Sequence, residues 1–112
     1  MSDNYQTPST VTTNQVAAVA SQSQPVRALN TVYHNATSKP IYCSVVGVIA
    51  ATGGFIAAYT DNQAAPTLLV AAFTADVVVT SFQATVLFIV LPGNYYKVYP
   101  GTITLAYWTE WT

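Results

Sequence analysis

The residues of this 112-residue chain that could do chemistry are few and widely spaced. His34 is the single histidine, and a Ser-His-Asp arrangement would have to combine it with Ser38 or Ser44 and with Asp61 or Asp76. No Gly-x-Ser-x-Gly motif, which places a serine nucleophile on a sharp turn, supports such a triad, and the spacing of these residues is arbitrary. We therefore expect no catalytic residues and no enzymatic activity.

Metal ligands are equally sparse. One cysteine, one histidine and four acidic residues form no pair at i, i+2 or i, i+4 spacing. Cys43 cannot form an internal disulfide, and its strand-like surroundings predict a small buried hydrophobe. Asp61 with Asn62 is typical of a turn, with a calcium ligand as the weaker alternative. We expect neither a metal ion nor a cofactor.

Aromatic side chains with a hydroxyl or an indole N–H form the most prominent candidate site. Such side chains are enriched in interface hot spots, and they also stack on sugar rings. Ordinary packing in the core and between subunits is the interpretation we favour. Together with two apolar residues of the N-terminal segment, the candidate oligomer or capsid interface consists of Val16, Val19, Tyr95, Tyr96, Tyr99, Tyr107, Trp108 and Trp111.

Two further patterns carry weaker predictions. Asn35-Ala36-Thr37 matches the N-glycosylation pattern, but a three-residue match is common by chance. Lys97 and Glu110 are the only charges in their predicted strands, so they could pair across strands or between subunits if they are neighbours.

Charge is scarce throughout the chain. Only seven residues are charged at neutral pH, and the formal net charge is −1. A nucleic-acid binder needs a basic surface that neutralises several phosphates, so we expect no nucleic-acid partner. Since soluble monomers usually cover their surface with many more charges, this composition favours burial against copies of the chain or against a large scaffold. No secretory signal is recognisable at the N-terminus.

Two uncharged stretches, 40–60 and 77–96, are each about long enough for a membrane-spanning helix. A small two-span membrane protein, such as a holin, is therefore an alternative to consider. Against it, Gly47 and Thr52-Gly53-Gly54 interrupt the first stretch, and Gln83 and Pro92-Gly93-Asn94 interrupt the second. Both stretches are rich in strand-favouring residues and neither has a flanking Lys/Arg cluster, so we expect no membrane partner.

The elements that would position these residues are short strands. Residues 85–101 predict a hairpin: an apolar arm over 86–91, a Pro-Gly-Asn turn, and an aromatic arm over 95–99. In 102–111, alternation predicts that Ile103, Leu105, Tyr107, Thr109 and Trp111 face one way and the intervening residues the other. The remaining predicted strands are 26–35, 41–50, 55–59, 68–73 and 77–80.

Seven or eight strands without intervening helices predict an all-β fold, an antiparallel β-sandwich of jelly-roll type. The strands 41–50 and 86–91 are uncharged and predicted to be buried on both faces, which in a two-layer sandwich requires an oligomer interface. Residues 1–25 are mostly polar and predict an extended N-terminal arm, fixed by a partner or folded back on its own domain, with residues 26–112 as the sandwich domain.

Several segments of this domain resemble the small β-sandwich modules of tailed-bacteriophage virion proteins. They are RALNTVYHN at 27–35, SKPIY at 38–42, PGNYYKV at 92–98 and WTEW at 108–111. The resemblance implies a homotrimer on the outside of the virion and no enzymatic activity, but it does not distinguish a capsid protein from a fibre domain.

From the resemblance and the polar arm, we expect a trimeric capsid decoration, or cement, protein. Its arm and sandwich base would tie together subunits of the major capsid protein on the outer capsid surface, where many weak contacts give avidity. The alternative is a receptor-binding module of a tail fibre or tail tip, which would hold a host surface glycan with its aromatic residues.

Overall fold

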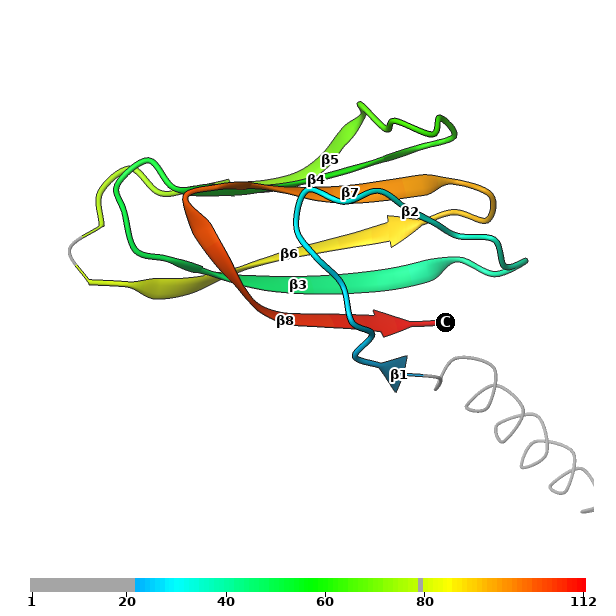
Figure 1. Ribbon diagram of the computed structural model, residues 1–112, viewed down its shortest axis with the longest axis horizontal. Coiled ribbons are helices and arrows are strands. Elements are labelled where there is room, and N and C mark those ends of the chain that lie inside the picture. The colour runs from blue at the N-terminus through cyan, green and yellow to red at the C-terminus, as the bar shows by residue number, and fades with distance from the viewer. Residues whose placement is uncertain (1–21, 79) are drawn as a thin grey trace, which may run out of the picture.

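The computed structural model describes residues 22–78 and 80–112, which form two antiparallel four-stranded sheets packed face to face (Figure 1). This confirms the predicted all-β sandwich. No helix long and apolar enough to cross a membrane is found in the described part of the chain. The strands are β1 (Gln22–Ser23), β2 (Tyr33–His34), β3 (Ile41–Ile49), β4 (Phe55–Asp61), β5 (Leu69–Thr74), β6 (Phe82–Val90), β7 (Tyr95–Gly101) and β8 (Ile103–Trp111).

Strands far apart in the sequence lie side by side in both sheets. We call the sheet with the order β1-β8-β3-β6 sheet A, and the sheet with the order β2-β7-β4-β5 sheet B. The first strand pairs with the last, the second with the seventh, the third with the sixth and the fourth with the fifth. The chain is therefore wound like a long hairpin rolled up on itself, with successive strands often in opposite sheets.

The core lies between the two sheets. β3 alternates between fully buried and more accessible positions along its whole length, because every second side chain points to sheet B. β6 repeats this pattern in register with β3 over nine residue pairs. The inward-facing side chains of both sheets make one cluster: Ile41, Cys43, Val45, Ile49, Ile56, Ala58, Ala75, Ala84, Val86, Phe88, Val90, Tyr96, Val98 and Trp108.

The sequence predicts that an oligomer interface covers the second face of the two uncharged strands, and in the single chain this face is open. Their outward side chains, such as Tyr42 on β3 and Leu87 and Ile89 on β6, are exposed. Most outward positions in this part of the two strands are apolar like the inward ones, which is why the sequence alone does not separate the two rows.

The predicted hairpin over residues 85–101 also differs from the structure. The turn forms as expected, with the Asn94 amide donating to the Leu91 carbonyl and Gly93 at φ 84°. The arms do not pair, however, because β6 belongs to sheet A and β7 to sheet B. A turn signal between two strand-like runs thus marks a crossing between sheets here.

A β-bulge changes the predicted faces of the last strand. Val46 pairs with Tyr107 and Gly47 pairs with Leu105, so Ala106 is an extra residue on β8. Because the alternation shifts there, Ile103 and Leu105 pack against the same core as Trp108. The predicted strict alternation over 102–111 is therefore wrong on the N-terminal side of the bulge, at Ile103 and Leu105.

Two other predicted strands are shorter or absent. Of residues 26–35, only Tyr33 and His34 form a strand, because Asn30 adopts a positive φ of 57° and turns the chain. Val77 and Val78 are not in a strand, since they lie between β5 in sheet B and β6 in sheet A. Most of the predicted N-terminal arm, including Val16 and Val19, lies outside the described residues.

Candidate functional site

A buried carboxylate organises one side of the sandwich. Glu110 on β8 is only 5% exposed. Its Oε2 accepts hydrogen bonds from the Tyr96 hydroxyl and from the Trp108 Nε1–H, both at 2.9 Å. Arg27 completes the site with a two-pronged ion pair, its Nε donating to Oε2 at 3.2 Å and its Nη2 to Oε1 at 3.3 Å. The charge of Glu110 is thus fully partnered inside the protein.

Arg27 belongs to residues 24–32, which run from β1 on sheet A to β2 on sheet B; we call them the strap (Figure 1). The Arg27 guanidinium also lies 4.5 Å from the ring centre of Tyr33. The Asn30 amide donates to the Val98 carbonyl at 2.6 Å, which fixes the strap to β7. The strap therefore closes this side of the sandwich through one ion pair and several hydrogen bonds.

The same cluster fixes two ionisation states. Burial, and next the hydrogen bond to Glu110, raises the pKa of the Tyr96 hydroxyl well above its ordinary value, so this hydroxyl stays protonated and can donate. The predicted Lys97–Glu110 pair does not form, because Glu110 points into the core while the Lys97 ammonium lies over the Tyr59 and Tyr99 rings. Arg27 takes the role that the sequence suggested for Lys97.

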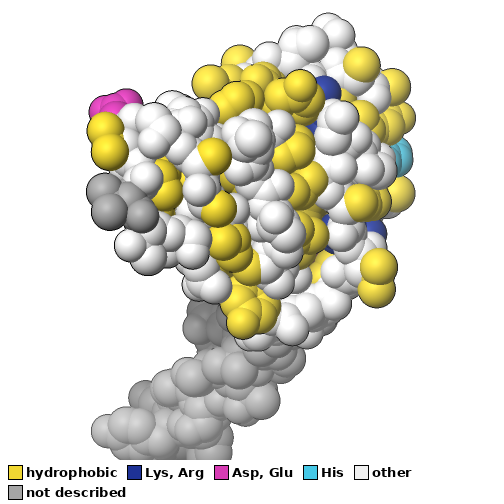
Figure 2. Space-filling view, turned by 60° about the vertical axis from the view of Figure 1, so that its left-hand side comes forward, with side chains coloured by type: hydrophobic (Ala, Val, Ile, Leu, Met, Phe, Trp, Pro, Cys, Tyr) yellow, Lys and Arg dark blue, Asp and Glu magenta, His cyan; other side chains and the backbone are white. Residues whose placement is uncertain are grey.

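The outward side of sheet A carries an apolar surface, which we call outer face A. Tyr42 on β3 stands between Ile89 on β6 and Trp111 on β8 in the strand register. Leu87 is 68% exposed, while Ile89 and Tyr42 are each 49% exposed. A shallow hollow of about 330 Å³ lies among these residues. Figure 2 shows how few charged side chains one view of the molecule contains among apolar and polar ones.

The outward side of sheet B, outer face B, is aromatic instead. Phe55 and Tyr99 stack with ring centres 6.0 Å apart. The Lys97 ammonium lies 5.7 Å from the ring centre of Tyr59 and 5.9 Å from that of Tyr99. At the β2 end, His34 stacks on Tyr95 at 4.2 Å. This face thus combines flat rings with one positive charge.

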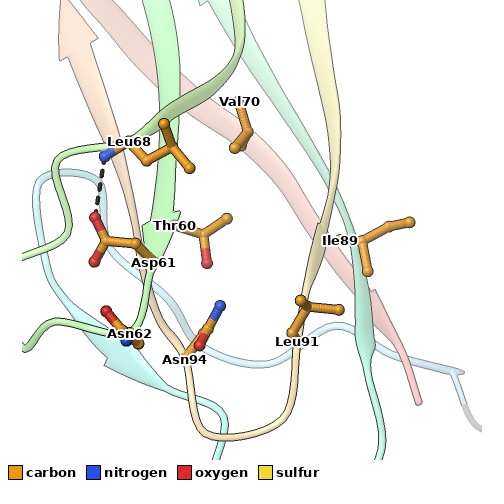
Figure 3. A pocket seen from close by; sticks show the side chains of 8 residues that line it. All are labelled: Thr60, Asp61, Asn62, Leu68, Val70, Ile89, Leu91 and Asn94. Carbon is orange, nitrogen blue, oxygen red and sulfur yellow. Dashed lines mark hydrogen bonds between the residues drawn. The ribbon is translucent and has the colours of Figure 1, made fainter.

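A second hollow, of about 410 Å³, opens between the edges of the two sheets (Figure 3). Leu68 and Val70 line it from the sheet B side and Ile89 and Leu91 from the sheet A side. Asp61 lies at its rim, but its Oδ2 accepts from the Thr67 and Leu68 amides and its Oδ1 from the Gln63 amide. These bonds, the one from Thr67 above all, lower the pKa of Asp61.

Asp61 is therefore the predicted turn residue, and it organises the loop over 62–68. No group of three or more His, Cys, Asp or Glu residues that could hold a metal ion occurs among residues 22–78 and 80–112. Two polar side chains that line the hollow are engaged within the chain: Asp61 through its loop amides, and the Thr60 hydroxyl, which donates to the Tyr95 carbonyl at 2.8 Å.

The remaining candidate groups occupy structural positions. His34 lies on the surface with a ring nitrogen 3.2 Å from the Gly93 carbonyl oxygen. Cys43 is 1% exposed, which confirms the buried hydrophobe that the sequence predicted, and burial raises the pKa of its thiol. Among the described side chains, His34 makes no hydrogen bond to Ser38, Ser44 or Asp61.

Asn35 is fully buried, although its sequence matches a glycosylation pattern. Its amide nitrogen donates to the Lys39 carbonyl at 2.8 Å and to the Val90 carbonyl at 3.0 Å. Its Oδ1 accepts from the Thr37 hydroxyl and amide. A glycan on this nitrogen would replace one of its two hydrogens and so remove at least one donor bond inside the protein, so Asn35 is a structural residue that fixes residues 35–39 to the end of β6.

The structure does not bring the predicted interface residues together. Tyr96 and Trp108 lie in the core, because both point inward to Glu110, and no partner can reach them in the folded chain. Tyr95 and Tyr99 belong to outer face B, whereas Tyr107 and Trp111 lie on the opposite side of the sandwich, on outer face A. The residues of the candidate interface are thus divided among three places.

Sequence reasoning missed the partner of Glu110, and it did not tell the outward residues of β6 from the inward ones. The uncharged, largely apolar sequence of β3 and β6 is the signal that predicted an interface on these strands. No comparable signal marks Arg27, which stands 83 positions from Glu110 in the sequence. The comparisons add no relative: no family model, no curated protein and no solved structure matches this chain.

Proposed function

We propose that this chain is a non-enzymatic structural protein of a tailed bacteriophage, a trimeric decoration protein that docks on the major capsid protein at the outer capsid surface. The observation that carries the proposal is the exposed apolar outer face A. Contiguous exposed apolar surface on a small protein marks an interaction site more often than not. The phage setting and the trimer rest on the resemblance of residues 27–112 to virion modules.

The character of outer face A indicates the kind of partner. β3 and β6 contain no charged residue, so a partner surface need supply no counter-charge. Tyr42 and Trp111 offer large amphipathic side chains of the type enriched in interface hot spots, and aliphatic residues surround them. An uncharged, apolar surface on a shell subunit would match this face, and many copies on one shell would make weak docking effective.

Two further observations support a structural role. The groups with the greatest chemical potential serve the fold: Glu110 holds the strap, Asp61 caps a loop and Cys43 is buried. The strand orders β1-β8-β3-β6 and β2-β7-β4-β5 support the jelly-roll topology, which is common among capsid proteins.

Outer face B supports the second candidate, a glycan-binding tip. Its Tyr59 and Tyr99 rings flank the Lys97 ammonium, and aromatic rings of this kind can stack on sugar rings while a cation holds an acidic substituent. Binding of host-surface polysaccharide that is lost in Tyr99→Ala and kept in Tyr107→Ala would favour this candidate over capsid docking.

The experiment that tests the first candidate is immunogold labelling of intact virions with antibody against this chain. Gold over the whole head supports the decoration protein, and gold confined to tail or fibre tips contradicts it. The docking surface is tested on shells stripped of the protein. We expect Tyr42→Lys to bind shells at least about tenfold more weakly than the wild type, whereas Val26→Lys, on the strap, binds normally. Equal binding of the two variants would contradict docking through outer face A.

A further inference from the structure

Each sheet of a sandwich has two edge strands, and an exposed edge presents unpaired backbone groups to other chains. The edges of this protein lie on two sides. The strap side contains the short strands β1 and β2 beside β8 and β7, and the opposite side, which we call the open side, contains β6 of sheet A and β5 of sheet B. The four edges differ in how well they are protected against pairing.

On the strap side, both edges carry features that prevent pairing. β8 has an extra residue at Ala106, and a bulge twists an edge and breaks its ladder. β7 contains Lys97 and Pro100, a charge and a residue without an amide donor. The strap and the two short strands occupy further parts of these edges.

On the open side, β5 is also protected. It has six residues, and its register with β4 shifts between Ala58 and Tyr59, so Val70 is an extra residue. A short, bulged edge offers only a few aligned backbone groups to a partner.

β6 carries none of these features. It pairs with β3 over nine residues without a register shift, and it contains no charge, no proline and no glycine. Most of its residues belong to the β-branched and aromatic set that favours strands. In the described residues, its second edge has no strand beside it. A long, regular, uncharged edge of this kind is a template for strand addition.

We propose that β6 pairs with β6 of a second copy of this chain, antiparallel across a two-fold axis, so that sheet A continues into the partner. A two-fold contact places each residue against its own strand, and any charge near the axis would therefore face a like charge. β6 has no charge at any position, so no repulsion between like charges on the two strands opposes self-pairing in any register. The outward residues Thr85, Leu87 and Ile89 would meet the same row of the partner and join the two outer faces A.

A second copy fits better than an unrelated strand for one further reason. Every strand pair in this protein is antiparallel, and a two-fold axis perpendicular to the sheet generates that arrangement without any change in the fold. The inference concerns the purified chain and does not depend on the proposed virion role. If the chain also forms trimers, this contact joins one trimer to another, and assemblies contain even numbers of chains.

Cysteine pairing tests the geometry in the full chain. Single variants Thr85→Cys, Leu87→Cys and Ile89→Cys are oxidised alone and in pairwise mixtures, and the buried Cys43 of the wild type serves as the unreactive control. In two-fold antiparallel pairing, the residue numbers of the two linked positions must always add up to the same value. If cysteines at position 87 link to each other, for example, a cysteine at position 85 must link to one at position 89. Links with varying sums, or no links, overturn the proposal.

Charges introduced at position 85 test the contact without removing an apolar side chain. We expect Thr85→Lys to raise the dissociation constant of the pair at least about tenfold in sedimentation experiments, because it places like charges near the axis. An equal mixture of Thr85→Lys and Thr85→Glu should restore pairing. Thr104→Lys, an exposed threonine on β8 of the same sheet, is the matched control and should pair normally. Monomers or trimers alone of the wild type would each overturn the proposal.

Discussion

The two long sides of the sandwich differ in how well their strand edges are protected against pairing with another chain. On the strap side, Arg27 reaches across the layers to the buried Glu110, and the neighbouring edges carry a bulge, a lysine and a proline. On the open side, β6 presents a regular edge and apolar outward residues such as Leu87. One side is closed within the chain, and the other leaves its apolar surface available to a partner.

The difference separates residues that stabilise the fold from residues that are available for association. The strap side contains the hydrogen-bonded Arg27–Glu110 ion pair, in which Glu110 is buried and Arg27 partly buried, so changes there should cost folding free energy. The open side contributes its inward residues to the core and its outward residues to the surface. Outward changes there should affect association and leave folding nearly intact.

The largest expected effect comes from breaking the strap side. Glu110→Ala leaves Arg27, the Tyr96 hydroxyl and the Trp108 indole without their shared acceptor. We expect a loss of about 3–5 kcal/mol in the free energy of unfolding, measured by urea denaturation, as is typical when one member of a buried ion pair is removed. Glu110→Gln, which keeps an acceptor, should lose less. A loss below about 1 kcal/mol for Glu110→Ala would contradict a stabilising role for the cluster.

Asn35→Ala tests the connection between the two sides, because Asn35 joins the loop after β2 to the end of β6. The substitution leaves the buried Val90 carbonyl without its side-chain donor. We expect a loss of about 1–3 kcal/mol in the free energy of unfolding. Exposed Thr31→Ala is the control and should change it by less than about 0.5 kcal/mol.

Acid should loosen the open side at the loop over 62–68. The folded-state pKa of Asp61 lies below its unfolded value, which is about 3.9. The stabilisation from its carboxylate is therefore complete above that unfolded value and is lost as the pH falls through the folded value. Amide exchange of Thr67 and Leu68, corrected for intrinsic rates, should accelerate at low pH. Asp61→Asn should remove that dependence, and an unchanged pH profile in this variant would contradict the assignment.

The smallest effect on folding is expected for outward residues on either side. Leu87→Lys on β6 and Val26→Lys on the strap, which is 98% exposed, should each change the free energy of unfolding by less than about 0.5 kcal/mol. Only Leu87→Lys should weaken association, as measured by sedimentation. Equal association of the two variants would remove the proposed distinction between the sides.

The sequence predicts the fold class because strand composition and turn residues act locally. The strand β3 follows from its run of strand-favouring residues, and the turn at residues 92–94 follows from Pro-Gly-Asn. The sheet membership of β6 and β7 does not, since a turn between sheets and a hairpin turn use the same residues. The bulge at Ala106 is equally invisible, because it arises from the pairing of β8 with β3.

The candidate surface was predictable only in part. Low charge and uncharged strands indicated an interface, and the aromatic residues indicated which side chains to consider. Tyr96 and Trp108 were assigned to that interface wrongly because their inward orientation depends on Glu110, and the strap that brings Arg27 to Glu110 is a long-range contact. Leu87 and Ile89 belong to a strand predicted to be buried on both faces, because an unbroken apolar run does not show which row of side chains faces outward.

The most direct test of the contrast between the two sides is residue-resolved amide hydrogen exchange of the full chain at high concentration, in the wild type and in Thr85→Lys. The account predicts that the β6 amides that point away from β3 are protected in the wild type and exchange rapidly in Thr85→Lys. The Asn30 amide, which bonds to Val98, should stay protected in both. Rapid exchange of those β6 amides in the wild type, at the rate seen in Thr85→Lys, would contradict the account.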